Sequence, residues 1–463
     1  MQSRRAFIKN IGLALPAFTL AGSLLSSCGS KKFETPNKRI KIGIIGAGIS
    51  GLHAAYLLHF DQRYEIEVLE ASDRIGGRIQ SEKSLFGLCS AEIGASNIYG
   101  RGGEWYNIAS VNGLKRIDGI ESTYFIGQSD YNDNEIEADS DYIRMKSTLD
   151  KMKHSTSSDD VSIDAFCDME GVPERVKFIL KAQTEQLLGT DIDRASLNYS
   201  QSEALSRLNT EQYKGSNLES VIFDKYKSVL PFVSNNIKIN SIDYKGDKVI
   251  VTDHLQQNHV YDRVIVTVPL SILKIQEGKP NHIQFSPKLP ASKIEAKNKL
   301  GMDGGYKIFL KLKKRFWKED TGSVYLNSAI GKYDVIFSDD SKQEYVISAF
   351  VTGKTAESNL GMKNDREIIE FIKSDWKQLL GTAYSDIITD HKIVNWSNDP
   401  NIGGCFSYHK VGTEYNVRQV LSESIDNKLF FAGEACNTEN KSGTVEGAIE
   451  TAIKTVKAIQ VLI

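Results

Sequence analysis

The chain has 463 residues, and its 57 Lys and Arg against 59 Asp and Glu give a formal net charge of -2. This balance excludes a globally basic nucleic-acid binder, and five cysteines are too few for a disulfide scaffold. A hydrophobic content of 40% is typical of a soluble globular chain and excludes a multi-span membrane protein.

The first 27 residues predict an export signal. Arg4 and Arg5 precede an apolar run over residues 11–25, and these 15 residues are fewer than the roughly 20 that a membrane-spanning helix needs. A basic start, a short apolar centre and small residues at the end are the layout of a secretory signal. The paired arginines resemble a twin-arginine signal, which implies export across the bacterial inner membrane.

Residues 25–28 resemble a bacterial lipoprotein cleavage box, with Cys28 as the lipidated first residue of the mature chain. This resemblance implies a periplasmic or membrane-anchored lipoprotein that touches the membrane only through its lipid. Residues 28–38 are mostly polar and are predicted to be a tether between the lipid and the first domain. An uncleaved anchor helix is the alternative.

A dinucleotide-binding unit is predicted to start at residue 39. Residues 39–45 are β-branched and apolar toward their end, as in a buried parallel strand, and a glycine-rich turn follows at once. Residues 52–60 have the pattern of a helix, and residues 64–69 predict a second strand. A strand, a glycine-rich turn and a helix in this order indicate a Rossmann-like fold.

The residues of this turn have expected roles in holding the dinucleotide. Gly46 makes the turn, Gly48 lets the backbone approach a pyrophosphate, and Gly51 lets the helix pack on the strand. Ser50 lies at the helix N-terminus, whose free N–H groups bind phosphates. Glu70 stands 24 residues past Gly46 and is expected to bind a ribose hydroxyl. A glycine-rich turn that binds nothing is the alternative.

The next motif favours FAD over NAD. Arg74, Gly76, Gly77 and Arg78 resemble the Arg-x-Gly-Gly-Arg segment of the amine-oxidase branch of FAD proteins. The resemblance implies that Gly77 allows close approach to the flavin side of the cofactor and that Arg78 pairs with the pyrophosphate. An exposed basic turn is the alternative.

A segment near the C-terminus resembles the last FAD-binding segment of the same family. Residues 428–432 predict a strand, and an amphipathic helix follows after a short loop. The resemblance places Gly433 with the cofactor contacts and implies that Glu434 contacts the ribityl–pyrophosphate region. It also implies that Thr444 and Val445 lie beside the isoalloxazine, at a helix N-terminus that favours negative charge on the reduced flavin.

The middle of the chain agrees with this interpretation. Residues 237–239 and 261–269 alternate as strands do and resemble the family's central cofactor-domain insert, in which Ile237 would present its backbone to the adenine. The resemblance to flavin monoamine and polyamine oxidases therefore spans nearly all of the mature chain. Desaturases and porphyrinogen oxidases carry similar cofactor motifs.

Lys307 is the predicted catalytic residue. It stands ten residues before Trp317 and resembles the amine-oxidase lysine that holds a water near flavin N5. A desolvated lysine beside a flavin tunes proton and oxygen chemistry. The alternative is a strand lysine that faces solvent.

Residues 396–406 resemble the family segment that runs under the flavin ring, which makes Trp396 a cofactor contact. In monoamine oxidases a cysteine at the place of Cys405 is joined through sulfur to the flavin 8α-methyl carbon, so we predict a covalent thioether here. A small buried apolar cysteine is the alternative. Phe406 and Thr444 match the two facing tyrosines of monoamine oxidases, so one aromatic wall of the substrate pocket is missing.

A further segment resembles the one that enters the family's substrate domain, with Gly94 and Ala95 as cofactor contacts. Tyr99 is predicted to be either a pocket residue or core filler. Amino-acid oxidases carry an arginine near the position of Asn97 to grip the substrate carboxylate. Asn97 argues against an α-amino acid bound in that manner, although Arg101 or another arginine could substitute.

The expected fold is α/β, with a Rossmann-like FAD-binding domain interleaved with a discontinuous α+β substrate domain. The segments expected for the FAD-binding domain are 39–93, 210–275 and 393–463, and those for the substrate domain are 94–209 and 276–392.

The expected activity is that of an FAD-dependent amine oxidase. It oxidises a C–N bond to an imine, releases a carbonyl compound with ammonia or an amine, and passes the electrons to molecular oxygen to give hydrogen peroxide. The alternatives are an L-amino-acid oxidase or tryptophan 2-monooxygenase-like enzyme, and a flavin-binding redox partner without amine turnover. The substrate is thus a small amine or amino acid, and the eight histidines show no spacing that predicts a metal.

Overall fold

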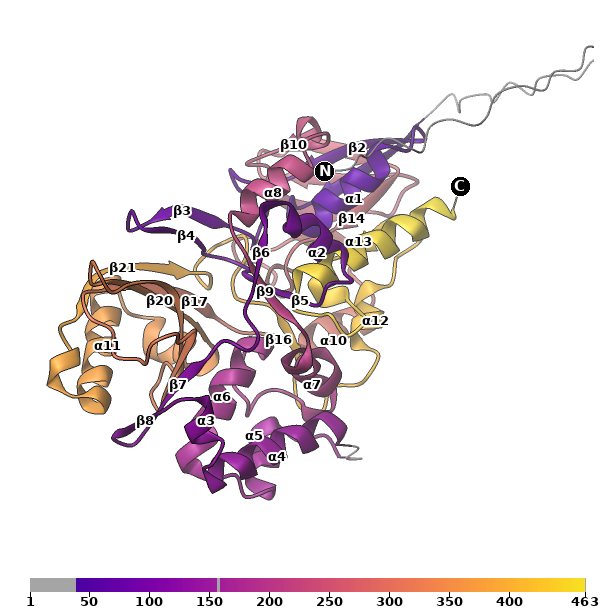
Figure 1. Cartoon of the computed structure of the whole chain (residues 1–463). Coiled ribbons are helices and arrows are strands. Elements are labelled where there is room, and N and C mark those ends of the chain that lie inside the picture. Colours follow the sequence, from indigo (N-terminus) through magenta and orange to yellow (C-terminus); the bar gives the residue numbers. More distant parts are fainter. Residues whose placement is uncertain (1–38, 156–158, 463) are drawn as a thin grey trace, which may run out of the picture. The chain divides into compact units, whose positions relative to one another are not determined.

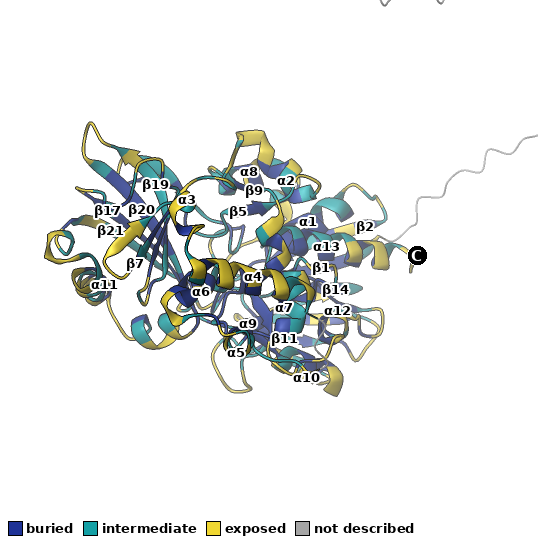
Figure 2. Ribbon diagram, turned by 60° about the horizontal axis from the view of Figure 1, so that its bottom comes forward, coloured by how far each residue is buried: buried dark blue, intermediate teal, exposed yellow. Residues whose placement is uncertain are grey.

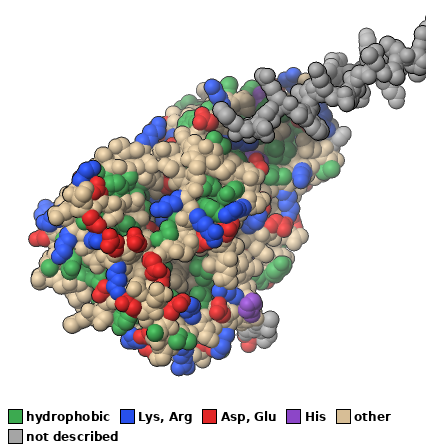
Figure 3. Space-filling view, in the orientation of Figure 1, with side chains coloured by type: hydrophobic (Ala, Val, Ile, Leu, Met, Phe, Trp, Pro, Cys, Tyr) green, Lys and Arg blue, Asp and Glu red, His purple; other side chains and the backbone are tan. Residues whose placement is uncertain are grey.

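Residues 39–155 and 159–462 are described by a computed structural model (Figure 1). The predicted export signal, the lipidation site Cys28 and the tether over residues 28–38 lie outside this range. Among the described residues, no helix combines the length and the apolar character needed to cross a membrane. Basic and acidic side chains are interspersed over the face seen in Figure 3, as expected from the near-neutral net charge.

A five-stranded parallel sheet carries the dinucleotide motif. Its strand order is β10 (Val233–Ser234), β2 (Tyr64–Leu69), β1 (Ile40–Ile45), β14 (Arg263–Val266) and β23 (Leu429–Phe431). Helices α1 (Ile49–His59) and α13 (Val445–Gln460) pack side by side on one face of this sheet, although they lie at opposite ends of the chain (Figure 1). The strands predicted beside the glycine-rich turn and near the C-terminus are confirmed, and so is the Rossmann-like α/β fold.

The opposite face of the parallel sheet packs on a second, four-stranded sheet. Its strand order is β13 (Asn258–Tyr261), β12 (Val249–Asp253), β11 (Ile239–Asp243) and β15 (Gln284–Ser286). Both faces of the parallel sheet are covered, as strand β1 shows. Ile44 packs toward the helices and Ile45 toward the second sheet, and each is at most 4% exposed. A parallel strand buried on both faces reads as an unbroken apolar run.

A seven-stranded sheet forms the other half of the protein. Its strand order is β21 (Ile388–Asn395), β17 (Gly305–Leu312), β20 (Glu344–Thr352), β19 (Lys332–Asp339), β18 (Ser323–Leu326), β7 (Ser122–Ile126) and β8 (Ser129–Tyr131). One face packs on the amphipathic helix α11 (Asp365–Leu380), where Ile308 meets a core that includes Trp376. Because side chains alternate along a strand, Lys307 and Phe309 point to the opposite face, which borders a cavity.

Further helices and small sheets complete the fold, and some of them line this cavity. One group of helices comprises α4 (Ser140–His154), α5 (Ile163–Met169), α6 (Glu174–Leu188) and α7 (Leu197–Glu203). The other helices are α2 (Glu104–Ala109), α3 (Asp133–Ile136), α8 (Leu218–Lys225), α9 (Leu270–Leu273), α10 (Ala291–Lys299) and α12 (Val417–Ser422). The remaining strands are β3 (Ser81–Leu85), β4 (Cys89–Glu92), β5 (Asn97–Tyr99), β6 (Leu114–Arg116), β9 (Gln212–Gly215), β16 (Leu300–Met302) and β22 (Ser407–His409). Figure 2 shows buried residues along the central strands and exposed residues on the outer sides of helices such as α4 and α10.

The predicted division of the chain into domains stays a prediction. All five strands of the parallel sheet come from the segments expected for the FAD-binding domain. Three other sheets pair strands from both sets of segments: β15 with β11, β9 with β5 and β6, and β16 with β22.

Candidate active site

A cavity of about 1650 Å³ lies between the carboxyl ends of the parallel strands and the open face of the seven-stranded sheet. This edge of a parallel sheet is where such folds bind their ligands. Gly51 is the one predicted site residue of the described part that does not line the cavity. The others do: Gly46, Gly48, Ser50, Glu70, Gly77, Arg78, Gly94, Ala95, Tyr99, Ile237, Lys307, Trp396, Cys405, Phe406, Gly433, Glu434, Thr444 and Val445.

The glycine-rich turn has the geometry that a pyrophosphate requires. Gly46 has a φ of +103°, which an L side chain rarely adopts, and a Cβ on Gly51 would lie 2.0 Å from the Gly46 carbonyl oxygen. A Cβ on Gly48 would meet no atom within 4 Å, so this residue borders open space at the start of α1. The buried Oγ of Ser50 has no hydrogen-bond partner within the described chain. These features fit FAD, whose phosphates would occupy this end of the cavity.

The second glycine motif packs directly on the first. The N–H of Gly76 donates to the carbonyl oxygen of Ala47 at 2.9 Å, and Gly76 forms a parallel bridge with Gly48. A Cβ on Gly77 would lie 3.3 Å from the Cα of Gly48. The two glycine motifs thus form one backbone cradle.

Glu70 and Ile237 are connected through their backbones. The carboxylate of Glu70 accepts the N–H of Ala47 at 2.6 Å and the hydroxyl of Ser72 at 2.7 Å, so it holds the glycine-rich turn in place. The N–H of Ile237 donates to the Glu70 carbonyl oxygen at 2.7 Å. Because this N–H is already bonded, a backbone contact from Ile237 to the adenine would have to use its carbonyl group. The ribose and adenine contacts stay predictions.

The carboxylate of Glu434 joins the N-terminal and C-terminal motifs. It accepts a hydrogen bond from Arg78 Nη1 at 3.0 Å, from Ser407 Oγ at 2.7 Å and from the N–H of Gly443 at 2.9 Å. Burial raises the pKa of Glu434, but Arg78 and Arg418 more than offset this effect and lower the pKa below its usual value. Glu434 is therefore an ionised anchor in the cavity wall.

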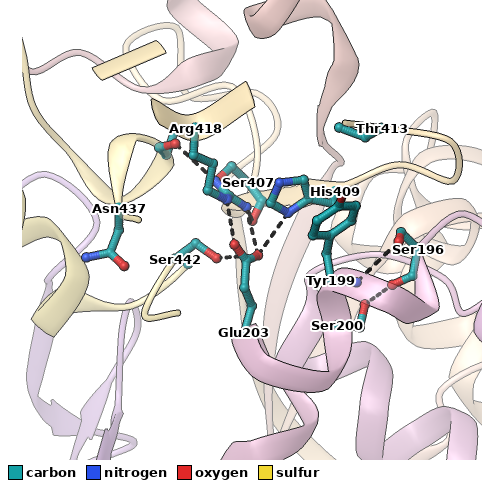
Figure 4. Close-up of polar contacts among 12 residues, drawn as sticks. Ser196, Tyr199, Ser200, Glu203, Ser407, His409, Thr413, Arg418, Asn437 and Ser442 are labelled. Carbon is teal, nitrogen blue, oxygen red and sulfur yellow. Dashed lines mark hydrogen bonds and ion pairs between the residues drawn. The ribbon is translucent and has the colours of Figure 1, made fainter. Parts of the chain in front are cut away.

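A polar network behind this wall fixes Ser407 (Figure 4). Arg418 donates to Ser407 Oγ at 2.7 Å and to Glu203 Oε1 at 2.8 Å. Ser442 Oγ donates to Glu203 Oε2 at 2.7 Å, and His409 Nδ1 lies 3.1 Å from the same atom. The network connects α7, β22 and α12. It includes Ser407 and Ser442, which directly neighbour Phe406 and Gly443 in the chain.

Lys307 lies inside the cavity and not at the protein surface. Its residue is 9% exposed, and its Nζ donates to the Gly94 carbonyl oxygen at 3.0 Å and to Ser96 Oγ at 3.2 Å. Burial and, second, the nearby ammonium of Lys214 lower the pKa of Lys307 to about 8. The neutral amine is thus accessible near neutral pH, and the alternative of a solvent-facing strand lysine is excluded.

The aromatic wall contains a residue that sequence reasoning missed. Phe406 packs between two glycines, since a Cβ on Gly189 or on Gly443 would lie 2.8 or 2.6 Å from its ring. Phe350 on β20 lies beside it, with ring centroids 6.3 Å apart and planes at 24°. A second aromatic ring is therefore present, although Thr444 does not provide it.

Thr444 caps helix α13. Its Oγ1 accepts the N–H of Gly447 at 3.0 Å and donates to the Lys441 carbonyl oxygen at 2.6 Å. With Val445 it brings the helix N-terminus to the cavity, as the predicted flavin contact requires.

The thiol of Cys405 and the indole of Trp396 are both buried in the wall. Cys405 Sγ donates to the Gly304 carbonyl oxygen at 3.2 Å, and burial raises the pKa of this thiol. The Trp396 indole N–H donates to the Ile93 carbonyl oxygen at 3.0 Å. The thioether to the flavin stays a prediction.

Tyr99 both lines the cavity and packs against the helical core. Its hydroxyl accepts a hydrogen bond from Asn97 Nδ2 at 3.4 Å, and the Arg207 guanidinium lies 5.6 Å from its ring centroid. Arg101 pairs with Glu211 at 2.8 Å, with 59% of its side chain exposed, and does not line the cavity. Arg207, which sequence reasoning did not single out, also lies in the cavity wall, next to Tyr99.

Sequence reasoning also missed three charged residues on strands of two different sheets. They are Lys214 on β9 and Lys332 and Asp334 on β19. The alternation of Lys332 and Asp334 along a strand was the available signal, but only the strand register shows that they face the cavity. Within residues 39–155 and 159–462, no group of three or more His, Cys, Asp or Glu side chains is arranged to hold a metal ion.

A strand–glycine turn–helix unit opening on a cavity with a buried lysine defines a dinucleotide-dependent oxidoreductase. Residues 227–460 match the profile of the flavin containing amine oxidoreductase family, and residues 44–110 match that of an NAD(P)-binding Rossmann-like domain. The chain therefore belongs to the flavin containing amine oxidoreductase family and is an FAD-dependent enzyme acting on amines.

Similar proteins come from plants, animals and bacteria. A probable polyamine oxidase 4 of Arabidopsis thaliana is 28% identical over 440 residues, covering 89% of this chain and 85% of the relative. The human lysine-specific histone demethylase 2 is 27% identical, covering 90% of this chain and 53% of that protein. Among solved structures, cyclohexylamine oxidase from Brevibacterium oxydans superposes with a TM-score of 0.74 at 20% identity, covering 91% of this chain and 99% of the other. Putrescine oxidase bound to putrescine superposes with a TM-score of 0.75 at 17% identity, covering 92% and 99%.

Proposed function

We propose that this enzyme oxidises a small amine with molecular oxygen as the electron acceptor. The reacting C–N bond loses two electrons and two protons and becomes an imine, and oxygen takes them up as hydrogen peroxide. Water then converts the imine to a carbonyl compound and ammonia or a smaller amine. FAD supplies the two-electron chemistry when it is bound.

The observation that carries the proposal is the position of Lys307. Its Nζ is anchored by two acceptors, Gly94 O and Ser96 Oγ, and a lysine ammonium has three N–H groups. The third position is free to hold a water or to exchange a proton at Nζ. The low pKa of Lys307, about 8, makes both protonation states available during turnover.

Other residues position the substrate and exclude bulk water. Phe350 and Phe406 supply an apolar part of the cavity wall, which favours the neutral amine over the ammonium form. Relatives named polyamine oxidase, putrescine oxidase and cyclohexylamine oxidase support an amine as substrate.

A peroxide assay over a panel of amines and amino acids tests the proposal. Substrate under anaerobic conditions should bleach the flavin absorbance, and oxygen should restore it with release of peroxide. Flavin that no panel member reduces would instead indicate a redox partner without amine turnover. If a substrate bleaches the flavin but no peroxide is released, the enzyme uses an electron acceptor other than oxygen.

We also propose that residues 1–27 direct export and that Cys28 carries the lipid anchor; the support is the sequence pattern described above. A Cys28→Ala chain should leave the membrane fraction, whereas a Cys89→Ala control should stay in it. A Cys28→Ala chain that still sediments with membranes contradicts the anchor.

The thioether between Cys405 and the flavin is a further proposal, supported by the place of Cys405 in the cavity wall. Cys405 would supply the sulfur, and forming the bond to bound FAD would release two protons and two electrons, which molecular oxygen would accept. Because burial raises the pKa of the thiol, attachment should be faster at high pH. After acid precipitation, yellow colour in the pellet supports the bond and yellow colour in the supernatant contradicts it.

A further inference from the structure

The cavity wall near Lys307 carries a cluster of three charged side chains. Lys214 Nζ lies 2.9 Å from Asp334 Oδ2, and Lys332 Nζ lies 3.1 Å from Asp334 Oδ1. All three line the cavity, with between 17% and 25% of each side chain exposed. Two ammonium groups therefore share one carboxylate in a largely buried place.

Strand register places this cluster beside the predicted catalytic lysine. Lys214 pairs with Asn97 across β9 and β5, and Asn97 follows Ser96, which binds Lys307 Nζ. Asp334 pairs with Ser348 of β20, the strand that neighbours β17. The ammonium of Lys214 lowers the pKa of Lys307 and the carboxylate of Asp334 raises it, so the groups interact electrostatically.

Two lysine ammonium groups share the single carboxylate of Asp334, so this cluster carries a net positive charge. Arg207 also lines the wall and is only 7% exposed, but its charge is offset by those of Glu203 and Glu434. Glu92, another acid near Lys307, is already held by Ser81 Oγ at 2.7 Å, and burial raises its pKa. A net positive charge removed from water is costly unless an anion compensates it.

Lys332 keeps its charge in this buried place. Burial lowers the pKa of Lys332, but Asp334 outweighs this effect and raises it above the usual value. Burial raises the pKa of Asp334, but Lys214 and Lys332 more than offset this and lower it. Lys332 Nζ also donates to Gln186 Oε1 at 3.3 Å, which leaves a third donor to point into the cavity.

We propose that the substrate is an amine that also bears a carboxylate, and that this carboxylate binds Lys214 and Lys332. The inference rests on the proposed amine oxidation at the same site and names its substrate class. Charge-assisted hydrogen bonds from two lysines hold the carboxylate while the apolar wall holds the rest of the molecule. The second ammonium of a diamine such as putrescine would instead meet two like charges, which disfavours binding.

Matched pairs of substrates test this on the FAD-bound enzyme. The pairs are phenylalanine and phenethylamine, tryptophan and tryptamine, ornithine and putrescine, and 6-aminohexanoate and hexylamine. In at least one pair, the carboxylate member should have a kcat/KM about tenfold or more above that of its partner. Amines that are oxidised as well as or better than their carboxylate partners in every pair overturn the inference but leave amine oxidation standing. Flavin that no member of any pair reduces overturns both.

Variants separate the lysines from the general electrostatics of the cavity. Lys332→Met should raise KM for the carboxylate substrate about tenfold, with kcat changed less and the KM of the matched amine unchanged or lower. Lys311→Met is the matched control, because Lys311 pairs with Glu344 in the same sheet but outside the cavity. An equal effect of Lys332→Met on both members of a pair contradicts the inference. If Lys332→Met retains no FAD, the more conservative Lys332→Gln variant takes its place. The inference is then judged on this variant and on the kcat/KM ratios of the wild-type enzyme within each substrate pair.

Discussion

The Nζ atom of Lys307 on β17 lies 3.0 Å from the carbonyl oxygen of Gly94, which stands 213 residues earlier in the chain. Gly94 is itself locked to the cofactor cradle, since a Cβ there would lie 2.2 Å from the Arg78 carbonyl oxygen. The lysine on β17 is therefore positioned by a backbone atom of the loop between β4 and β5, which packs on Arg78. This contact couples the substrate side of the cavity to the flavin side.

Replacing Lys307 should slow the flavin chemistry without loss of the cofactor. Lys307→Met removes the group that exchanges a proton at Nζ, and we expect flavin reduction or reoxidation to fall by about tenfold to a hundredfold or more. The ionisation near pH 8 should also disappear from the rate profile. Stopped-flow absorbance of the holoenzyme measures both half-reactions, with Lys311→Met as the control. Unchanged rates of both half-reactions would remove Lys307 from the mechanism.

The same lysine should make the free energy of unfolding depend on pH. Its pKa is lowered to about 8, chiefly by burial and then by Lys214, against 10.5 for a free lysine. Below pH 8 the lysine is protonated in both the folded and the unfolded state. The folded state then bears the full cost of a buried charge. Between pH 8 and 10.5 the unfolded chain binds more protons, so the free energy of unfolding rises with pH in this window. The difference between wild type and Lys307→Met should grow in favour of the wild type by about 3 kcal/mol across it. Denaturant titrations at pH 7.5 and 10.5 measure this, and a difference independent of pH would contradict the lowered pKa.

Removing Arg78 should weaken both the fold and cofactor retention. Arg78→Met leaves the buried carboxylate of Glu434 with Arg418 as its remaining ionic neighbour, and breaking such a pair costs about 3 to 5 kcal/mol. Flavin content after gel filtration and thermal unfolding of the holoenzyme measure the two effects. Arg63→Met is the control, because Arg63 forms a surface pair with Asp61 and its removal should change neither. Full flavin content and an unchanged unfolding midpoint in Arg78→Met would show that Glu434 does not need this partner.

The glycine-rich turn allows folding and cofactor binding to be separated. Gly51→Ala puts a Cβ 2.0 Å from the Gly46 carbonyl oxygen, so the turn must shift and the protein should be strongly destabilised. Gly48→Ala places its methyl group in open space of the cavity, so the fold should survive while FAD affinity falls. Flavin titration and unfolding midpoints of both variants show the contrast. Equal unfolding midpoints for the two variants would contradict the assigned roles.

Local features of the chain were predictable and long-range ones were not. The strand at residues 64–69 and the roles of Gly46 and Gly51 depend on neighbours within a few residues, and the structure has them as expected. The cluster of Lys214 and Asp334 depends on strands 120 residues apart, whose register no local pattern contains. Sequence reasoning could therefore find the cofactor cradle but not the charged cluster in the cavity wall.

Thr444 shows the same limit at a single position. The family resemblance placed it where an aromatic wall stands in monoamine oxidases, and its hydroxyl instead caps α13 through Gly447. The ring beside Phe406 comes from Phe350, on a strand whose side-chain direction is fixed only when β20 pairs with β17. A residue match in one segment therefore does not describe a pocket built from several.

Phe350 should contribute to substrate binding and not to flavin binding. Phe350→Ala opens the apolar wall beside Phe406, and we expect the KM of the preferred substrate to rise about tenfold while flavin content stays constant. Phe125→Ala is the matched control, because Phe125 lies in the same sheet but packs against Phe316 outside the cavity. Phe125 is partly buried, so the control should lower the unfolding midpoint moderately and should leave KM unchanged. Steady-state kinetics and thermal unfolding of the two holoenzymes distinguish packing from binding. If Phe350→Ala lowers only the unfolding midpoint, then its ring supports the sheet and the aromatic wall is Phe406 alone.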